Sequence, residues 1–320
     1  MSTRNKIEDD YRELDLRPGA SPDEVRSSYR ELALFWHPDR FHAQPDQLAR
    51  AHQKMTRINL AYERIRKAIA RKPNSRPTSP DGRPRASHSP REARTNSLGM
   101  KFVSVPGTSV FFSIWETRVQ DYRAHAQAAI EVGGSWKNPG FPQTDTDPVV
   151  NVSWDEAKRF CVWLTEKEKR EGKLPAGSQY RLPTDAEWSW AVGIGDREGS
   201  GVPKAKGWRL KTIYPWGAQW PPPKGAGNYD PSLGTDSFDH TSPVGSFAAN
   251  EQGLFDLGGN VWEWCEDFLD GRSGNHVLRG GSWNFSSAGH LLSSYRNGAA
   301  SDARSGGIGF RYVLGLPKHR

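Results

Sequence analysis

The chain has 320 residues, of which 35% are hydrophobic and 11% aromatic, including 13 tryptophans. This length predicts about two domains, and the aromatic content supports at least one packed core even though the mean hydropathy is −0.77. No run of eighteen apolar residues occurs and the N-terminal residues are charged, so we expect neither a membrane span nor a signal peptide.

The net charge of +7 is distributed unevenly along the chain. Residues 71–97 hold 7 Lys/Arg and 2 Asp/Glu, whereas residues 98–320 hold 24 of each. A charge excess in one short segment favours a basic linker, and we expect no nucleic-acid partner and no membrane partner. Two cysteines, Cys161 and Cys265, do not form a disulfide framework and indicate a reduced, cytoplasmic protein.

Residues 8–70 have the pattern of a helical domain. The first helix is expected over residues 7–16 and ends before a Pro-Gly pair. The second begins after Ser21, an N-cap followed by proline, and repeats apolar residues every three or four positions as far as Trp36. The third covers residues 47–70 with a similar period.

The tripeptide His37-Pro38-Asp39 follows the second helix. Proline cannot continue a helix and disfavours helix at the residue before it, so the tripeptide exposes an imidazole and a carboxylate at a turn. Together with Tyr11, Leu14 and the stretch INLAYERI at 58–65, this arrangement resembles a J-domain. The resemblance implies that residues 8–70 recruit a DnaK-type heat-shock chaperone and stimulate its ATP hydrolysis.

The J-domain resemblance also implies which residues contact the chaperone. These are Arg26, Tyr29, Arg30, His37, Pro38, Asp39 and Arg40. The chain departs from the family at Glu31 and Phe35, which occupy helix positions that often carry Lys or Arg. Fewer cations weaken electrostatic steering, so docking is expected to be weaker or chaperone-selective.

Residues 71–97 are rich in Pro, Ser and Arg and nearly free of apolar residues. Such a composition cannot bury a core, so this segment is predicted to be a disordered linker. Residues 98–320 are instead rich in Trp, Gly and turn signals. Two helices are predicted there, one capped by Ser153 and one by Thr184 with Glu187 completing a capping box. The remainder is predicted to form short strands, such as 308–310, and long loops.

Seven stretches of residues 98–320 occur together in one family. They include YRLPTDAEWSWAV at 180–192, GLFDLGGNVWEWCED at 253–267 and the frame RGGSW…GIGFR at 279–311. This domain resembles the formylglycine-generating enzyme (sulfatase-modifying factor) family. The resemblance implies an irregular, C-type-lectin-like α+β domain, so the chain is expected to be multidomain, with an all-α J-domain at 8–70 and this domain at 98–320.

Two loops of this domain offer the oxygen ligands that calcium prefers. The family resemblance implies a calcium site in each loop, with glycine and apolar positions contributing carbonyl oxygens. The implied ligands are Asn228, Tyr229, Asp236 and Phe238 in one loop and Asp256, Gly259, Val261 and Glu263 in the other. The alternative is that the acidic residues only cap turns, but the chemistry and the resemblance favour structural calcium.

The oxidase activity of the family requires a cysteine pair that binds copper(I) through soft thiolates. Alignment from Gly280 places Phe285 and His290 at the two cysteine positions, and no cysteine follows Cys265. Cys161 lies in an apolar helical stretch and is expected to be packed. We therefore expect no copper, no formylglycine-generating activity and no catalytic residues.

Residues 284–307 are rich in Ser, Ala, Gly and Asn with interspersed aromatics, a composition typical of adaptable recognition surfaces. The predicted ligand-binding residues are Phe285, His290, Tyr295, Asn297, Gly298, Ala299, Ala303, Ser305 and Gly306. The chain is therefore interpreted as a co-chaperone targeted by a non-catalytic domain that binds a protein or small ligand.

Two alternatives remain open from the sequence. Convergence of His240, His276 and His290 with an acid such as Asp239 would favour a non-heme iron or other metal oxidoreductase of the same family. The segment 284–307 also resembles the variable region of proteins diversified by retroelements, which end in the same Gly-Phe-Arg.

Overall fold

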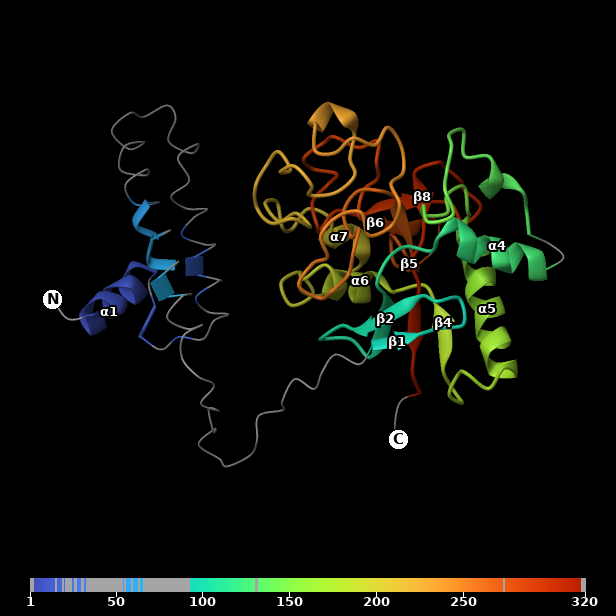
Figure 1. The fold of residues 1–320 in the computed structure, drawn as a ribbon, viewed down its shortest axis with the longest axis horizontal. Helices are drawn as coiled ribbons and strands as arrows, with labels where there is room; N and C mark the ends of the chain where they lie inside the picture. Colours follow the sequence, from blue (N-terminus) through green and yellow to red (C-terminus); the bar gives the residue numbers. More distant parts are fainter. Residues whose placement is uncertain are drawn as a thin grey trace. The chain divides into compact units, whose positions relative to one another are not determined.

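The computed structural model describes residues 3–14, 16–18, 20, 25, 28–29, 32, 54, 56–58, 60–62, 64–65, 93–129, 132–272 and 274–317 (Figure 1). The chain divides into two compact units, Met1–Ser87 and His88–Arg320. Of the linker expected over 71–97, residues 71–92 lie outside the described residues, whereas Ala93–Thr95 form a strand paired with residues 101–103, so the expected linker extended too far toward the C-terminus. In the described parts of the chain, no helix is both long enough and apolar enough to cross a membrane.

The first unit is built on helix α1 (Thr3–Glu13) and on helical turns from the predicted second and third helices. Tyr11 and Leu14 pack in a buried cluster with Val25, Ile58 and Ile65. Apolar burial of this kind is the main favourable term in the folding of a small helical domain. The apolar spacing in the sequence therefore does identify the side chains that meet in this core.

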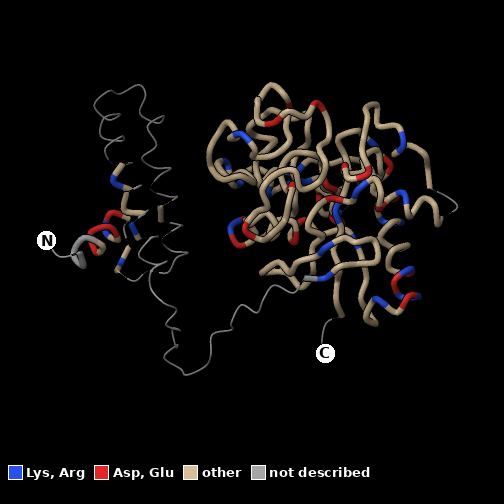
Figure 2. Tube along the Cα trace, in the orientation of Figure 1, with Lys and Arg blue, Asp and Glu red and all other residues tan. Residues whose placement is uncertain are grey.

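Ion pairs join α1 to the segment 54–65. Glu13 pairs with Lys54 at 2.7 Å and with Arg57 at 2.6 Å, and Asp10 pairs with Arg64 at 3.3 Å. Figure 2 shows acidic residues along α1 and basic residues in the neighbouring helical turns. Arg57 and Arg64 are largely exposed, so these pairs add little stability beyond that of the apolar core.

The second unit contains two small sheets and four α-helices among the described residues. Its elements in chain order are β1 (Ala93–Thr95), β2 (Lys101–Ser104), β3 (Val110–Ser113), α4 (Val119–Ala128), the 3₁₀ turn Ser135–Lys137, α5 (Trp154–Arg170), β4 (Gln179–Arg181), α6 (Asp185–Ala191), α7 (Pro203–Lys206), the 3₁₀ turn Pro231–Leu233, β5 (Trp262–Phe268), β6 (His276–Arg279), β7 (Asn297–Ala299), β8 (Ile308–Gly309) and β9 (Val313–Gly315).

The sheets bring distant parts of the sequence together. One has the order β1-β2-β3-β9-β4 and is antiparallel throughout, so the last strand of the chain lies between β3 and β4. The other has the order β7-β6-β5-β8, in which β8 pairs parallel with β5. The predicted binding segment 284–307 lies mostly in the two connections that flank β7.

Two helices begin where the sequence predicts. Ser153 and Thr184 each accept a hydrogen bond from the backbone N–H three residues on, and Glu156 and Glu187 bond back to complete capping boxes. Helix α4 was not predicted. Its first residue follows Arg118, whose backbone N–H donates to Asp121 at 3.1 Å. Arginine is not a usual N-cap residue, so the sequence carries no clear start signal here.

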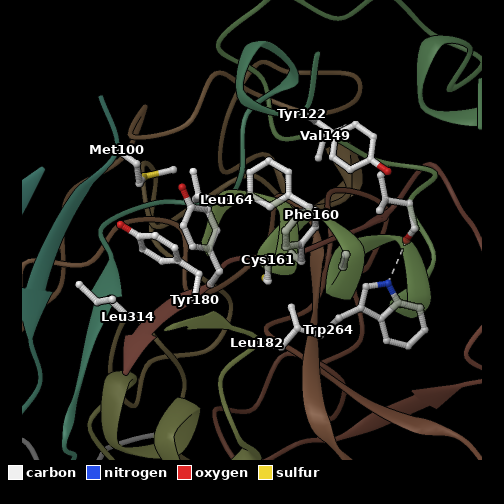
Figure 3. Packing of buried hydrophobic residues seen from close by; sticks show 14 of the residues in the cluster. Met100, Tyr122, Val149, Phe160, Cys161, Leu164, Tyr180, Leu182, Trp264 and Leu314 are labelled. Carbon is white, nitrogen blue, oxygen red and sulfur yellow. Dashed lines mark hydrogen bonds between the residues drawn. The ribbon is translucent and has the colours of Figure 1, made fainter. Parts of the chain in front are cut away.

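Aromatic side chains form the larger of the cores (Figure 3). The ring of Phe160 lies with its centroid 5.9 Å from Tyr122 and 5.4 Å from both Phe310 and Tyr312. Trp264 donates its indole N–H to the carbonyl of Val152 at 3.0 Å. Because large rings bury much area per residue, this core supports long loops with short strands.

Candidate functional site

Only Tyr29 of the predicted chaperone contacts lies among the described residues. Its ring stacks on Tyr62 with 4.1 Å between centroids, and the side chain is half-buried. Tyr29 therefore contributes to the packing of the first unit, in addition to its predicted contact with the chaperone. The other predicted contacts lie outside the described residues: Arg26, Arg30, His37, Pro38, Asp39 and Arg40.

The two loops predicted to hold calcium contact each other directly. Asn228 donates from its side chain to Oδ1 of Asn260 at 3.1 Å, and the backbone N–H of Asn260 donates to the carbonyl of Asn228 at 2.8 Å. Gly259 has φ +81°, and a Cβ there would lie 2.2 Å from the carbonyl oxygen of Asn228. Only glycine permits this close approach. The two loops therefore form one unit, centred on Asn260, which sequence reasoning missed.

A buried carboxyl pair lies beside this loop contact. Oδ1 of Asp256 and Oε2 of Glu116 are buried and have no hydrogen-bond partner among the described residues. Burial, followed by the charge of Asp256, raises the pKa of Glu116 well above its usual value. Burial likewise raises the pKa of Asp256 to about 6. Unpartnered, buried carboxylate oxygens are what a bound cation would satisfy, so Asp256 and Glu116 fit calcium. No motif in the sequence marks Glu116 as a site residue.

Glu263 does not fit the role of calcium ligand. Its two carboxylate oxygens accept four contacts, three from Arg311 at 2.6–2.8 Å and one from the indole N–H of Trp188 at 2.7 Å. A carboxylate offers about four lone-pair positions, so these donors occupy all of them. Both side chains of the Glu263–Arg311 pair are fully buried. Glu263 is better explained as the partner of a buried guanidinium.

The other predicted loop is closed by its own hydrogen bonds. Asp236 accepts the backbone N–H groups of Tyr229 at 3.1 Å and Phe238 at 2.9 Å. This is the turn-capping role that the sequence left open as an alternative. Oδ1 of Asn228 is buried without a partner among the described residues, so one side-chain ligand position remains in this loop. The side chains of Tyr229 in this loop and Val261 in the other loop are fully buried. Their predicted role as calcium ligands therefore concerns their backbone carbonyls.

An aromatic cluster occupies the place where the family resemblance implies a copper site. The rings of Phe285 and His290 lie 5.6 Å apart between centroids, and His290 lies 4.9 Å from Tyr295. Phe285 also contacts Trp262 at 5.2 Å, and Tyr295 contacts Trp208 at 5.1 Å. The structure thus brings Phe285, His290 and Tyr295 together as half-buried side chains on one surface. We call Trp208, Trp262, Phe285, His290 and Tyr295 the aromatic cluster.

The remaining predicted surface residues lie on β7 and on the connection that follows it. Asn297, Gly298 and Ala299 form β7, an edge strand, and Ala303 packs partly against the core. Ser305 is exposed. The carbonyl of Gly306 accepts the indole N–H of Trp283 at 3.0 Å, which ties this connection to the segment that carries Phe285.

A cavity of about 540 Å³ opens beside the same surface. Its lining comes from α4 and from the following segment as far as residue 143, and includes Trp136, Phe141 and Arg123. Phe141 lies 5.6 Å from Trp283 between ring centroids and would be 3.0 Å from a Cβ on Gly306. Cavities of this size, with apolar walls and a few polar groups, are typical of ligand sites.

Neither thiol is placed for chemistry. Cys161 and Cys265 are both free and buried. Burial raises the pKa of both thiols well above the usual range, so neither provides a thiolate at neutral pH. The expectation that Cys161 is a packing residue is confirmed.

The histidines considered for an iron site do not converge. His240 stacks on Phe141 at 4.4 Å, His276 stacks between Trp154 and Phe268, and His290 belongs to the aromatic cluster. Within the described ranges, no group of three His, Cys, Asp or Glu side chains is arranged to hold a metal ion. The geometry therefore gives no support to a facial triad.

A second buried ion cluster positions both ends of residues 280–295, the segment that carries Phe285, His290 and Tyr295. Arg279, which precedes this segment, donates to Asp185 and to the carbonyl of Ser293 at 2.8 Å. Arg296, which follows it, donates to Asp185 at 2.9 Å and also pairs with Glu198. Both arginines are fully or almost fully buried. The ends of the segment are thus positioned by charge pairing inside the protein.

Two family models match this chain. The model of the sulfatase-modifying factor enzyme 1-like domain matches residues 94–316, and that of the DnaJ domain matches residues 9–73. Inactive C-alpha-formylglycine-generating enzyme 2 from Bos taurus is 32% identical over 201 residues, which are 56% of this chain and 56% of that protein. Formylglycine-generating enzyme from Streptomyces coelicolor is 29% identical over 211 residues, 56% of this chain and 58% of that protein.

The chain spans little more than half the length of these curated relatives. The solved structure of PvdO from Pseudomonas aeruginosa aligns with a TM-score of 0.50 and 20% identity, covering 72% of this chain and 100% of that one. At this identity the likeness concerns the fold alone. The matches confirm the predicted fold class, a helical J-domain joined to an α+β domain of this type.

Proposed function

We infer the function of this chain from the family to which it belongs, that of the sulfatase-modifying factor enzyme 1-like domain, joined here to a DnaJ domain. We propose that it is a targeting co-chaperone in the cytoplasm. The DnaJ domain would recruit a DnaK-type chaperone, and the second domain would bind a partner without catalysing a reaction on it.

One observation carries the binding role of the second domain. The aromatic cluster stands where catalysis would need thiolates, and both cysteines of the chain are buried. Half-buried aromatic side chains and small polar side chains on a firmly held segment suit recognition. The relative from Bos taurus is itself described as inactive, which supports a non-catalytic role.

The co-chaperone role is tested with the His37→Gln variant of the full chain. Wild-type protein is expected to stimulate the steady-state ATPase rate of a DnaK-type chaperone, and the variant is expected to leave that rate at its unstimulated value. The J-domain resemblance implicates this tripeptide in stimulation, and its proline is predicted to end the helix before it, so loss of the imidazole is expected to remove stimulation without unfolding the helices. Equal stimulation by both proteins would contradict the proposal.

The binding role is tested by affinity capture with the full chain. Tyr295→Arg places a long charged side chain in the aromatic cluster, and Lys101→Ala at an exposed position of β2 serves as the matched control. Wild type and control are expected to capture the same partner, and Tyr295→Arg is expected to lose it. Retention by Tyr295→Arg would exclude the aromatic cluster as the contact surface.

We also propose that calcium binds as a structural ion at Asp256 and Glu116. A cation there would satisfy the one oxygen of each buried carboxyl group that has no hydrogen-bond partner among the described residues. Adding 1 mM calcium after chelation is expected to raise the melting temperature by several degrees, as binding to the folded state alone requires. The double variant Glu116→Gln/Asp256→Asn is expected to show no such shift, whereas Asp236→Asn keeps it. A calcium-independent melting temperature in the wild type would rule out this site.

A further inference from the structure

One segment of the second unit is rich in cations and lacks acids. Residues 199–229 contain Lys204, Lys206, Arg209, Lys211 and Lys224 and no Asp or Glu. Lys206 is buried and paired with Asp185 at 2.7 Å. The other four are exposed, and none of them is ion-paired with a carboxylate in the parts of the chain that the structure describes. Their charge is therefore available to a partner.

The same segment exposes large apolar side chains. Val202, Trp208 and Trp220 are 46%, 53% and 38% exposed. Within residues 93–317, Val162 on α5 is the only other large hydrophobic exposed to this degree among those described. Trp220 lies 5.5 Å from Tyr214 between ring centroids. Exposed tryptophans gathered in one stretch mark an interaction surface more often than chance. We call residues 202–224 the basic–aromatic segment; it is the yellow region that begins at α7 in Figure 1.

The basic–aromatic segment is continuous with the aromatic cluster. Trp208 belongs to both, and a Cβ on Gly289 would lie 2.8 Å from its ring. The backbone N–H of Ser293 donates to the carbonyl of Ile213 at 2.8 Å, and that of Leu210 donates to Oγ of Ser294 at 3.4 Å. Packing against residues 289–295 fixes the position of Trp208, so the basic–aromatic segment and the aromatic cluster are joined at this side chain.

Acidic residues flank this cationic segment in the chain, Asp196 before it and Asp230 after it. Asp196 is exposed just before it in the chain, and Arg209 reaches back to the carbonyl of Glu198 at 2.8 Å. At the other end, the backbone N–H of Asp230 donates to the carbonyl of Phe285 at 3.2 Å. A long polyanion or a flat anionic bilayer would extend over these carboxylates and be repelled. A short acidic segment fits within them.

We propose that the partner of the second domain presents a short acidic peptide segment with at least one aromatic or large aliphatic side chain. Its carboxylates pair with Lys204, Lys211 and Lys224, and its apolar side chain packs on Trp208. This inference rests on the proposed binding function and specifies the chemistry of the partner at the same surface.

The test uses the full chain and a fluorescein-labelled 12-residue peptide in which Glu and Asp alternate with Phe and Leu. Fluorescence anisotropy is expected to show binding that weakens as salt is added. The variant Lys204→Glu/Lys211→Glu/Lys224→Glu is expected to bind about tenfold or more weakly, from three lost surface pairs. Trp208→Ala is expected to cost about tenfold. A peptide with Ala at the apolar positions should bind wild type and Trp208→Ala equally.

The matched control is Lys101→Glu/Lys169→Glu/Lys173→Glu, which makes the same change in net charge at exposed lysines of β2, α5 and the turn after α5. It is expected to change the affinity less than about twofold. Equal loss in both triple variants would show an effect of net charge alone and overturn the proposal. Absence of peptide binding, with binding only to oligo(dT) or to vesicles containing phosphatidylserine, would also overturn it.

The outcome separates this inference from the binding function itself. If the lysine triple variant still captures the partner that Tyr295→Arg loses, the acidic-segment inference fails and the proposed function stands. If neither Tyr295→Arg nor the lysine variant affects capture, both fail.

Discussion

Replacing Asp185 with asparagine is expected to lower the free energy of unfolding of the second domain by about 3–5 kcal/mol. Asp185 lies at the start of α6, and its side chain is almost fully buried. It accepts Arg296 at 2.9 and 3.0 Å and Lys206 at 2.7 Å, and it also pairs with Arg279. Asparagine keeps the shape but leaves these buried cations short of a negative charge.

The effect of this substitution depends on pH. Burial alone would raise the pKa of Asp185, but the charges of Arg279 and Arg296 and the hydrogen bonds from Arg296 and Lys206 hold it well below its usual value. A carboxyl with a depressed folded pKa contributes stability above its unfolded pKa of about 3.9 and loses it as the pH falls below that. The difference between wild type and Asp185→Asn is therefore expected to be full at pH 7 and to shrink below about pH 4.

Tryptophan fluorescence during urea unfolding provides the measurement. Twelve of the 13 tryptophans lie beyond residue 93 and only Trp36 precedes it, so the signal reports mainly on the second domain. Ser189→Ala is the control, because Ser189 also bonds Arg279 and Arg296 at 3.0–3.1 Å but carries no charge. It is expected to cost about 1 kcal/mol. Equal losses for the two variants would refute a charge-based role.

Replacing Arg311 with methionine is expected to have a comparable effect, about 3–5 kcal/mol. Arg311 is fully buried and is the guanidinium partner of Glu263. It also donates to the carbonyl of Phe255 at 2.9 Å. Its charge lowers the pKa of Glu116 and Asp256 against the larger effect of burial. Removing it takes the guanidinium charge away from three buried carboxyl groups, those of Glu263, Glu116 and Asp256.

The double variant Glu263→Gln/Arg311→Met isolates the pair. It is expected to be more stable than Arg311→Met alone, because the uncompensated charge on Glu263 is removed together with its partner. Arg311→Lys is expected to fall between Arg311→Met and wild type, since lysine keeps the charge but loses the forked contact. A double variant as unstable as the sum of the single changes would show that the two residues act independently.

The sequence by itself determined the local features of this protein. Ser153 and Thr184 start their helices through capping boxes that involve only neighbouring residues, and the apolar period of residues 8–65 identified the side chains that meet around Leu14. The lack of a cysteine after Cys265 likewise required no coordinates. Each of these properties depends on residues a few positions apart or on composition, which the sequence displays directly.

Only the tertiary structure decided which charges meet. Glu263 looked like a calcium ligand from its motif, but β8 and the chain that follows it bring Arg311 to both of its oxygens across 48 positions. Glu116 could not be recognised as a site residue from the sequence, because Asp256, its neighbour in space, lies 140 positions away in the chain. Trp208 joins the aromatic cluster only through its packing against Tyr295. Buried ion pairs and exposed surfaces depend on contacts between distant segments, so they follow from how the sheets bring those segments together.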